Sequence, residues 1–357
     1  MGKKKPGWVP PHCPNPNCLY FKNPEHRWPY KRKGFYYRRR RPYCIQRFTC
    51  LACGRQFSRQ TFSTTYWQKR PRLIPAIFSL VVGCMGNRQI ARALGCSPST
   101  VAHHIARLGR HCMLFQAQEL DRVALTGDVA IDGFESFEFS QYFPFHHNVA
   151  VNVDTGYILY HTDSPLRRKG RMTPYQKQKR AELEARYGRP NPRAVEVGVK
   201  ELLETISEGR ASMTVRSDDH RAYPRAMCGI NCQFTHRITS SKERRDQRNP
   251  LWEVNLLDLM IRHSTAAHKR ETVAWTKRRQ ASAEKLSIFQ VWRNYVKRRW
   301  ENGPDVSSAM LEGLAPRRVS IGELLRDRLF PGRITLPPRW RLYYDRRVKT
   351  AALAVNR

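Results

Sequence analysis

The chain has 357 residues, enough for two or three domains, and its 65 Lys and Arg against 29 Asp and Glu give a formal net charge of +36. Such an excess of cations is typical of a protein that binds nucleic acid, because neutralising phosphates releases counterions. A generally basic protein with solvated charged faces is the alternative. No apolar run approaches the roughly 20 residues of a membrane-spanning helix, and no apolar signal core follows the N-terminal lysines. We therefore expect a cytoplasmic, nucleoid-associated protein with no membrane partner.

Two pairs of cysteines near the N-terminus have the spacing of a zinc site. Cys13 and Cys18 form the first pair, and Cys50 and Cys53 form the second. Tetrahedral Zn²⁺ takes four soft donors that two short spacings bring together. Disulfides are not expected inside a cell, and so small a domain needs a metal to fold. These four thiols are the predicted Zn²⁺ ligands.

The residues around the second pair support this interpretation. Gly54 permits a turn after the last thiol, and Phe48 and Phe57 can close a small core over the metal. The basic, aromatic insert at residues 27–41 is a candidate for phosphate contacts. Free buried cysteines are the alternative to a metal site, and the rival ligands are Cys44, His12 and His26.

The next segment has the pattern of a helix-turn-helix. Gly95 allows a left-handed turn, Ser97 can cap a second helix, and Pro98 suits its first position. A plain helical hairpin is the alternative, but this order of turn, cap and helix favours DNA binding. The second helix would bury Val101, Ile105 and Leu108 and present Ser99, Thr100, His103, His104 and Arg107 to DNA.

From residue 123 the apolar period changes to that of strands, which predicts a mixed α/β sheet. Residues 163–193 are polar and basic, and we interpret them as an exposed insertion or linker. Residues 301–357 are basic, and their pattern predicts no fold. The predicted strands are 123–131, 147–153, 156–161, 213–216 and 232–238, and the predicted helical segments are 195–207 and 250–298.

Two acids stand at the ends of predicted strands, each before a turn. These are Asp132 and Asp218. If their strands are neighbours, the two carboxylates converge at one edge of the sheet and require a cation, for which Mg²⁺ is suited. Magnesium at such a site supports phosphoryl transfer. Ordinary solvated or capping carboxylates are the alternative, and we assign that role to Asp128, Asp154 and Asp219.

A third acid is expected from the helix that follows. Asn255, Asp258 and Arg262 share one helical face, whereas Glu253 lies about 140° from Asp258 around the helix. Asp258 also has apolar neighbours, so we prefer it and keep Glu253 as the alternative. Glu271 is expected to pair with arginines.

Together these segments resemble the DDE transposases of bacterial insertion sequences, which have a zinc ribbon, a helix-turn-helix and an RNase H-like catalytic domain. Residues 50–58 are similar to the end of the ribbon, and residues 89–101 are similar to the helix-turn-helix. Residues 131–137 resemble the first-acid motif, residues 217–223 the second, and residues 255–277 the third-acid helix with its basic continuation. The resemblance implies four regions: 1–65, 66–118, 119–300 with the insertion at 163–193, and the tail 301–357.

The chain departs from this family at the third acid, because the position of the family's glutamate falls on Asn255 and Asp258 lies one turn later. The resemblance implies a transposase that cuts and joins double-stranded DNA as a homodimer or larger assembly. Asp132, Asp218 and Asp258 would hold Mg²⁺ or Mn²⁺, with Arg262 and Lys269 along the DNA backbone. The alternatives are a catalytically inactive DNA-binding regulator and a metal-dependent nuclease.

Overall fold

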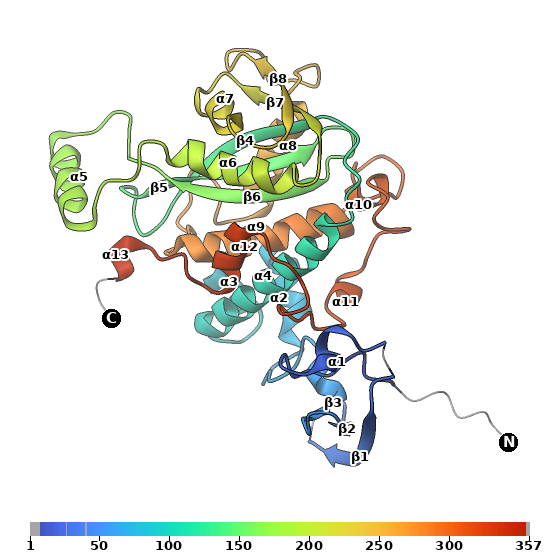
Figure 1. Ribbon diagram of the computed structural model, residues 1–357. Coiled ribbons are helices and arrows are strands. Elements are labelled where there is room, and N and C mark those ends of the chain that lie inside the picture. The colour runs from blue at the N-terminus through green and yellow to red at the C-terminus, as the bar shows by residue number, and fades with distance from the viewer. Residues whose placement is uncertain (1–7, 26, 40, 355–357) are drawn as a thin grey trace. The chain divides into compact units, whose positions relative to one another are not determined.

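The computed structural model describes residues 8–25, 27–39 and 41–354 (Figure 1). The chain divides into two compact units. The first unit contains residues 1–75 and 320–335, and the second contains residues 76–319 and 336–357. Within the described ranges, no helix is long and apolar enough to cross a bilayer.

The first unit is built on a small antiparallel sheet with the order β1-β2-β3. Its strands are β1 (Tyr30–Tyr37), β2 (Cys44–Cys50) and β3 (Gln56–Ser58), with helix α1 (Leu19–Lys22) before them and the 3-10 helix η1 (Arg59–Phe62) after them. Phe48 and Phe57 are buried, and their stacked rings have centroids 5.5 Å apart. Gly54 has a φ of +70° in the turn before β3. Both features agree with the predicted core and turn.

A distant segment completes this unit. Asp327 forms an isolated antiparallel bridge with Ser63, and the backbone N–H of Arg328 donates to the Phe62 carbonyl at 2.8 Å. The Phe330 ring packs against Phe62 with centroids 5.5 Å apart. Residues 320–335, which include α11 (Ile321–Leu324), are therefore part of the first unit, although they lie in the C-terminal region for which the sequence predicts no fold.

The second unit contains a mixed five-stranded sheet with the order β6-β5-β4-β7-β8 (Figure 1). Its antiparallel strands are β4 (Val129–Phe137), β5 (Pro144–Asn152) and β6 (Ile158–Pro165), and its parallel additions are β7 (Ser212–Asp218) and β8 (Gln233–Thr239). The mixed sheet agrees with the predicted fold class.

The first predicted strand begins six residues too early. Val123 and Leu125 lie outside any strand because their carbonyls accept hydrogen bonds from the Arg210 guanidinium, at 2.9 and 3.3 Å. Strand β4 also continues beyond Asp132 as far as Phe137. Asp132 therefore lies in the middle of a strand and not at its end, which corrects the expectation.

Helices cover both faces of the sheet. On one face, α8 (Trp252–Ser264) and α9 (Arg279–Val291) share an apolar core with Ala130 and Phe134 of β4. On the other face, α6 (Ala194–Ile206) approaches closely at Gly198, whose carbonyl accepts a hydrogen bond from Thr162 Oγ1 at 2.7 Å. Residues 265–278 between α8 and α9 are not helical, so the predicted helical segment at 250–298 is interrupted. A single turn of π-helix, η2 (Trp292–Val296), follows α9.

The basic insertion contains a helix and is not a linker. Helix α5 (Pro174–Tyr187) has Thr173 as its N-cap, with a side chain that accepts a hydrogen bond from the Gln176 N–H, and Pro174 at its first position. The polar composition of this segment reflects the absence of buried side chains from α5. The remaining C-terminal helices of the second unit are α10 (Ser308–Leu311), α12 (Pro338–Tyr344) and α13 (Ala351–Ala354), and α7 (Ala222–Met227) follows β7.

Candidate functional site

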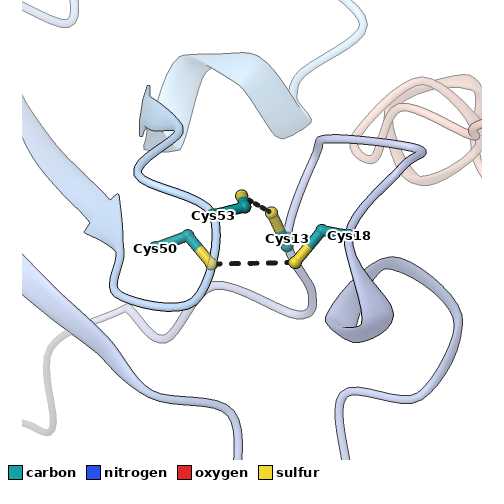
Figure 2. A group of neighbouring side chains, drawn as sticks. All are labelled: Cys13, Cys18, Cys50 and Cys53. Carbon is teal, nitrogen blue, oxygen red and sulfur yellow. Dashed lines mark hydrogen bonds between the residues drawn. The ribbon is translucent and has the colours of Figure 1, made fainter.

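The four predicted zinc cysteines meet at one point (Figure 2). Their sulfur atoms all lie within 4.8 Å of one another. The distance between sulfurs is 3.6 Å for Cys13 and Cys53 and 3.9 Å for Cys18 and Cys50. A tetrahedral site with Zn–S bonds of about 2.3 Å has sulfurs about 3.8 Å apart. The cluster therefore fits a zinc ribbon.

Two of the rival ligands, His12 and Cys44, do not belong to the cluster. His12 donates from Nδ1 to a backbone carbonyl at 2.9 Å, and its ring packs edge-on against Phe330 with centroids 4.8 Å apart. Cys44 is exposed at the start of β2 and does not join the cluster. The Trp28 indole N–H donates to the Cys50 sulfur at 3.3 Å, which orients that thiol. His26 lies outside the described residues.

The helix-turn-helix is formed by α3 (Asn87–Ala93) and α4 (Pro98–Leu120) after α2 (Leu73–Val82). Gly95 has a φ of +57°, and the Ser97 side chain accepts a hydrogen bond from the Thr100 N–H at 3.2 Å. Both local predictions are confirmed. The buried face of α4 includes Val101, Ile105 and Leu108, as expected.

One residue of the predicted recognition surface faces inward. His104 is only 5% exposed, so its assignment to the DNA-contacting side is wrong. Positions 101, 104, 105 and 108 follow the helical spacing of a single face, which places His104 with the apolar residues. Burial lowers the pKa of His104 below its ordinary value. Ser99 and His103 are exposed, whereas Thr100 and Arg107 are half-buried.

Asp132 and Asp218 lie on neighbouring parallel strands. The last paired residues of β4 and β7 are Ala130 and Arg216, and each aspartate comes two positions later. Side chains two positions apart in a strand point to the same face of the sheet. Ala130 faces the core formed with α8, and the Arg216 guanidinium donates to the Pro250 carbonyl, just before α8, at 3.4 Å. Both carboxylates therefore belong to the face that α8 covers.

The charges of both other aspartates act on Asp132. The pKa of Asp132 is raised to about 6, chiefly by burial and further by the charges of Asp218 and Asp258. The Gly133 N–H donates to Asp132 Oδ1 at 2.7 Å, which opposes the rise in pKa. The pKa of the Tyr223 phenol is also raised, by burial and then by Asp132 and Asp218. Sequence reasoning gave Tyr223 no role in the site, although it lies in the second-acid motif.

Asp258 is held by an ion pair within α8. Its Oδ2 accepts a hydrogen bond from Arg262 Nε at 3.1 Å, as expected for two residues on one helical face. Its Oδ1 is buried and has no hydrogen-bond partner in the described part of the chain. Glu253, the alternative third acid, is instead ion-paired with Arg299. Both candidate third acids are thus ion-paired with an arginine, and the preference for Asp258 stays a prediction.

The three aspartates are less tightly grouped than the cysteines. Among the residues that the structure describes, the four cysteines are the only group of possible metal ligands whose atoms all lie within 4.8 Å of one another. The carboxylate oxygens of the three aspartates do not meet this limit. The acidic cluster has a raised pKa at Asp132 and an unpartnered oxygen at Asp258, and both features fit a cation. Closer approach of the carboxylates, with Arg262 releasing Asp258, would be required to coordinate one.

The other acids have structural partners or face solvent. Asp128 binds the guanidinium groups of Arg216 at 2.7 Å and Arg237 at 3.2 Å. Asp219 accepts a hydrogen bond from the Ser241 hydroxyl at 3.3 Å. Asp154 lies in the turn between β5 and β6, and Glu271 is exposed.

Two basic residues that were expected to contact DNA have different surroundings. Arg262 lies over the Phe134 ring, at 5.6 Å from its centroid, and belongs with the acidic cluster. Lys269 is exposed and lines a cleft between α3 and the loop after α8, together with Arg88 and Arg92. Lys269 therefore adjoins the helix-turn-helix.

The raised pKa of Asp132 predicts a specific pH dependence of stability. Between its ordinary value of 3.8 and about 6, the folded protein holds a proton that the unfolded chain releases, so this group's stabilising contribution is lost as pH rises through that interval. Asp132→Asn should therefore raise the free energy of unfolding at about pH 7 and have little effect at about pH 4. Urea unfolding of both proteins without divalent cations measures the difference. An equal difference at the two pH values would contradict this assignment.

Comparison with known protein families supports the helix-turn-helix in this part of the chain. The model of a helix-turn-helix domain family matches residues 75–108. No curated protein matches the chain. The matching domain belongs to a family found in transposases and is of a type that binds DNA. The chain therefore has a DNA-binding helix-turn-helix domain, preceded by a cysteine cluster that fits a zinc ribbon.

Proposed function

We propose that this protein is a transposase of the DDE type that cuts the ends of a mobile DNA element and joins them to target DNA. The observation that carries the proposal is the placement of Asp132 and Asp218 on one face of neighbouring strands, with the charge of Asp258 acting on Asp132. A helix-turn-helix domain of a family found in transposases lies in the same unit of the chain.

The sheet supports an RNase H-like catalytic domain. Three antiparallel strands are followed by two parallel strands on the side of β4, and helices cover both faces. In this arrangement β4 is central, and the strand that carries the second acid lies directly beside it (Figure 1). A central strand positions a carboxylate rigidly because it is held by neighbours on both sides.

Asp132 and Asp218 would hold Mg²⁺ or Mn²⁺, with Asp258 as the third ligand. A bound divalent cation would stabilise the charge that develops on the oxygens of the phosphodiester. The Asp258 oxygen without a partner is the one available for this role. Arg262 would then be free to pair with a DNA phosphate, because its present ion pair with Asp258 would be broken.

The DNA-binding parts would recognise the ends of the element. The zinc ribbon and the exposed residues of α4, such as Ser99 and His103, would contact the terminal repeats. Two ends must be cut together, so the active form would be a homodimer or a larger assembly.

A second candidate function is a DNA-binding regulator derived from such an enzyme. The observation that favours it is the ion pair of Arg262 with Asp258, which neutralises the third acid. Asn255, where the family carries glutamate, adds to this argument. A metal-dependent nuclease without strand transfer would retain the acids and lack only the joining step.

One experiment separates the three functions. The purified protein is incubated with the DNA that flanks its gene, a target plasmid and Mg²⁺, alongside the variant Asp132→Asn. Joined products that the substitution abolishes support the transposase, nicks alone indicate the nuclease, and a gel shift without cleavage indicates the regulator.

A further inference from the structure

A second basic cleft, of about 1040 Å³, lies on the sheet face opposite α8. Its walls come from three places: the loop after β6, the N-terminal end of α6 and the residues after β7. Glu135 and His146 form part of its floor. They are paired across β4 and β5 and point away from the face of Asp132, because neighbouring positions along a strand alternate between faces.

The cleft contains more cations than carboxylates, since Glu135 and Glu196 are the acids among its lining residues. Lys169, Arg193, Arg221 and Arg225 line it and are exposed, and none forms an ion pair with a carboxylate in the ranges that the structure describes. Unpaired charges gathered on one concave surface raise the local concentration of anions.

Other arginines of the insertion have a structural role. Arg167 and Arg180 both bind Glu184 of α5, at 2.7 and 3.5 Å. The Phe143 ring packs against Tyr187 at the end of α5, with centroids 6.0 Å apart. These contacts anchor α5 and hold the loop with Lys169 at the rim of the cleft.

The cleft borders the backbone next to two of the aspartates. A side-chain carbon on Gly133, the neighbour of Asp132, would lie only 3.1 Å from His146 Nδ1. The backbone N–H of His220, which also lines the cleft, donates to Asp218 Oδ1 at 3.0 Å. The residues after β7 therefore connect the cleft to Asp218, whereas the Asp132 side chain points to the other face of the sheet.

We propose that this cleft binds the phosphodiester backbone of a DNA strand, independently of its sequence, beside the turn after β7 that follows Asp218. The inference rests on the proposed function for the chemistry at the acids, but the binding itself does not require cleavage. The unpaired cations come from three separate segments, a spacing that suits successive phosphates of one strand better than a single small anion. The insertion at 163–193 would then be a DNA-binding element.

Two double variants with equal changes of charge test the proposal. The first, Lys169→Glu with Arg193→Glu, alters the cleft. The matched control, Arg171→Glu with Lys177→Glu, alters exposed residues of the same insertion that do not line the cleft. Binding of fluorescent DNA of unrelated sequence is measured by anisotropy over a range of KCl without Mg²⁺, with single-stranded and duplex arms, and thermal melts confirm that all variants fold.

The cleft variant should weaken binding far more than the control. It should also reduce the slope of log Kobs against log salt by about 1.8 for duplex DNA or about 1.4 for single-stranded DNA. The form of DNA whose binding is weakened more is the form that the cleft binds. Equal losses in both variants, or none, would overturn the proposal. The same DNA binding is measured with Asp132→Asn, which is expected not to cleave. Normal binding by this variant would show that DNA binding in the cleft can be tested even if the proposed cleavage activity is wrong.

Discussion

Replacement of Asp218 by asparagine is expected to lower the rate of DNA cleavage by about a thousandfold, because loss of a metal ligand removes about 4 kcal/mol of transition-state stabilisation. Asparagine keeps the size of the side chain and the oxygen that accepts the His220 N–H, so the local turn should persist. DNA binding should change little. Cleavage of labelled flanking DNA under single-turnover conditions measures the rate.

Asp219 supplies a matched control for this substitution. It is the next residue and also a carboxylate, but it is exposed and hydrogen-bonded to Ser241. Asp219→Asn should therefore leave the rate of cleavage unchanged. A large loss at Asp219 with normal activity at Asp218 would mean that the second acid has been assigned to the wrong residue.

Loss of one cysteine of the cluster is expected to unfold the first unit. Structural Zn²⁺ in small domains contributes about 10–16 kcal/mol, which exceeds what this small aromatic core can supply. Cys13→Ser should abolish stoichiometric zinc and the cooperative unfolding transition of the first unit. Zinc content is measured by atomic emission, and folding by near-ultraviolet circular dichroism, since the core of this unit is rich in aromatic rings.

Cys44→Ser is the control, because Cys44 belongs to the same unit but is exposed and outside the cluster. This variant should bind one zinc ion and unfold like the parent. If both variants kept their zinc, the cluster would not be the metal site. If the parent contained no zinc after expression with added metal, the four thiols would be structural cysteines only.

Local features of the chain could be predicted well from the sequence. Short motifs determine their own geometry: Ser97 caps α4, Gly95 takes the left-handed turn, and Cys50 and Cys53 face the other pair. The cap and the turn depend on residues a few positions apart, and the short spacing within each cysteine pair is what indicates the metal site.

Features that depend on distant partners could not be predicted. The sequence pattern predicts a strand at Val123, but no strand forms there because the Arg210 guanidinium donates hydrogen bonds to the carbonyls of Val123 and Leu125. Residues 320–335 contact the segment after η1, about 260 positions earlier in the chain, for example through the hydrogen bond from the Thr64 hydroxyl to the Leu325 carbonyl. A pattern of neighbouring residues does not predict such a contact.

The predictions for the acidic site and for the recognition helix α4 have different outcomes. Asp258 and Glu253 lie on different sides of α8 and each binds an arginine, so the choice of Asp258 as the third acid stays a prediction. The prediction for His104 was wrong, because its position in the helical repeat of α4 lies on the buried face.

Binding of Mn²⁺ to the acidic cluster tests the central claim most directly. Electron paramagnetic resonance of the zinc-loaded protein, titrated with Mn²⁺ in the presence of flanking DNA, counts the bound ions without requiring cleavage. The proposed site predicts Mn²⁺ binding that Asp132→Asn and Asp218→Asn each weaken by at least about tenfold, and that Asp219→Asn leaves intact. Equal Mn²⁺ binding by the parent and the Asp132 and Asp218 variants, or none by the parent, would contradict it.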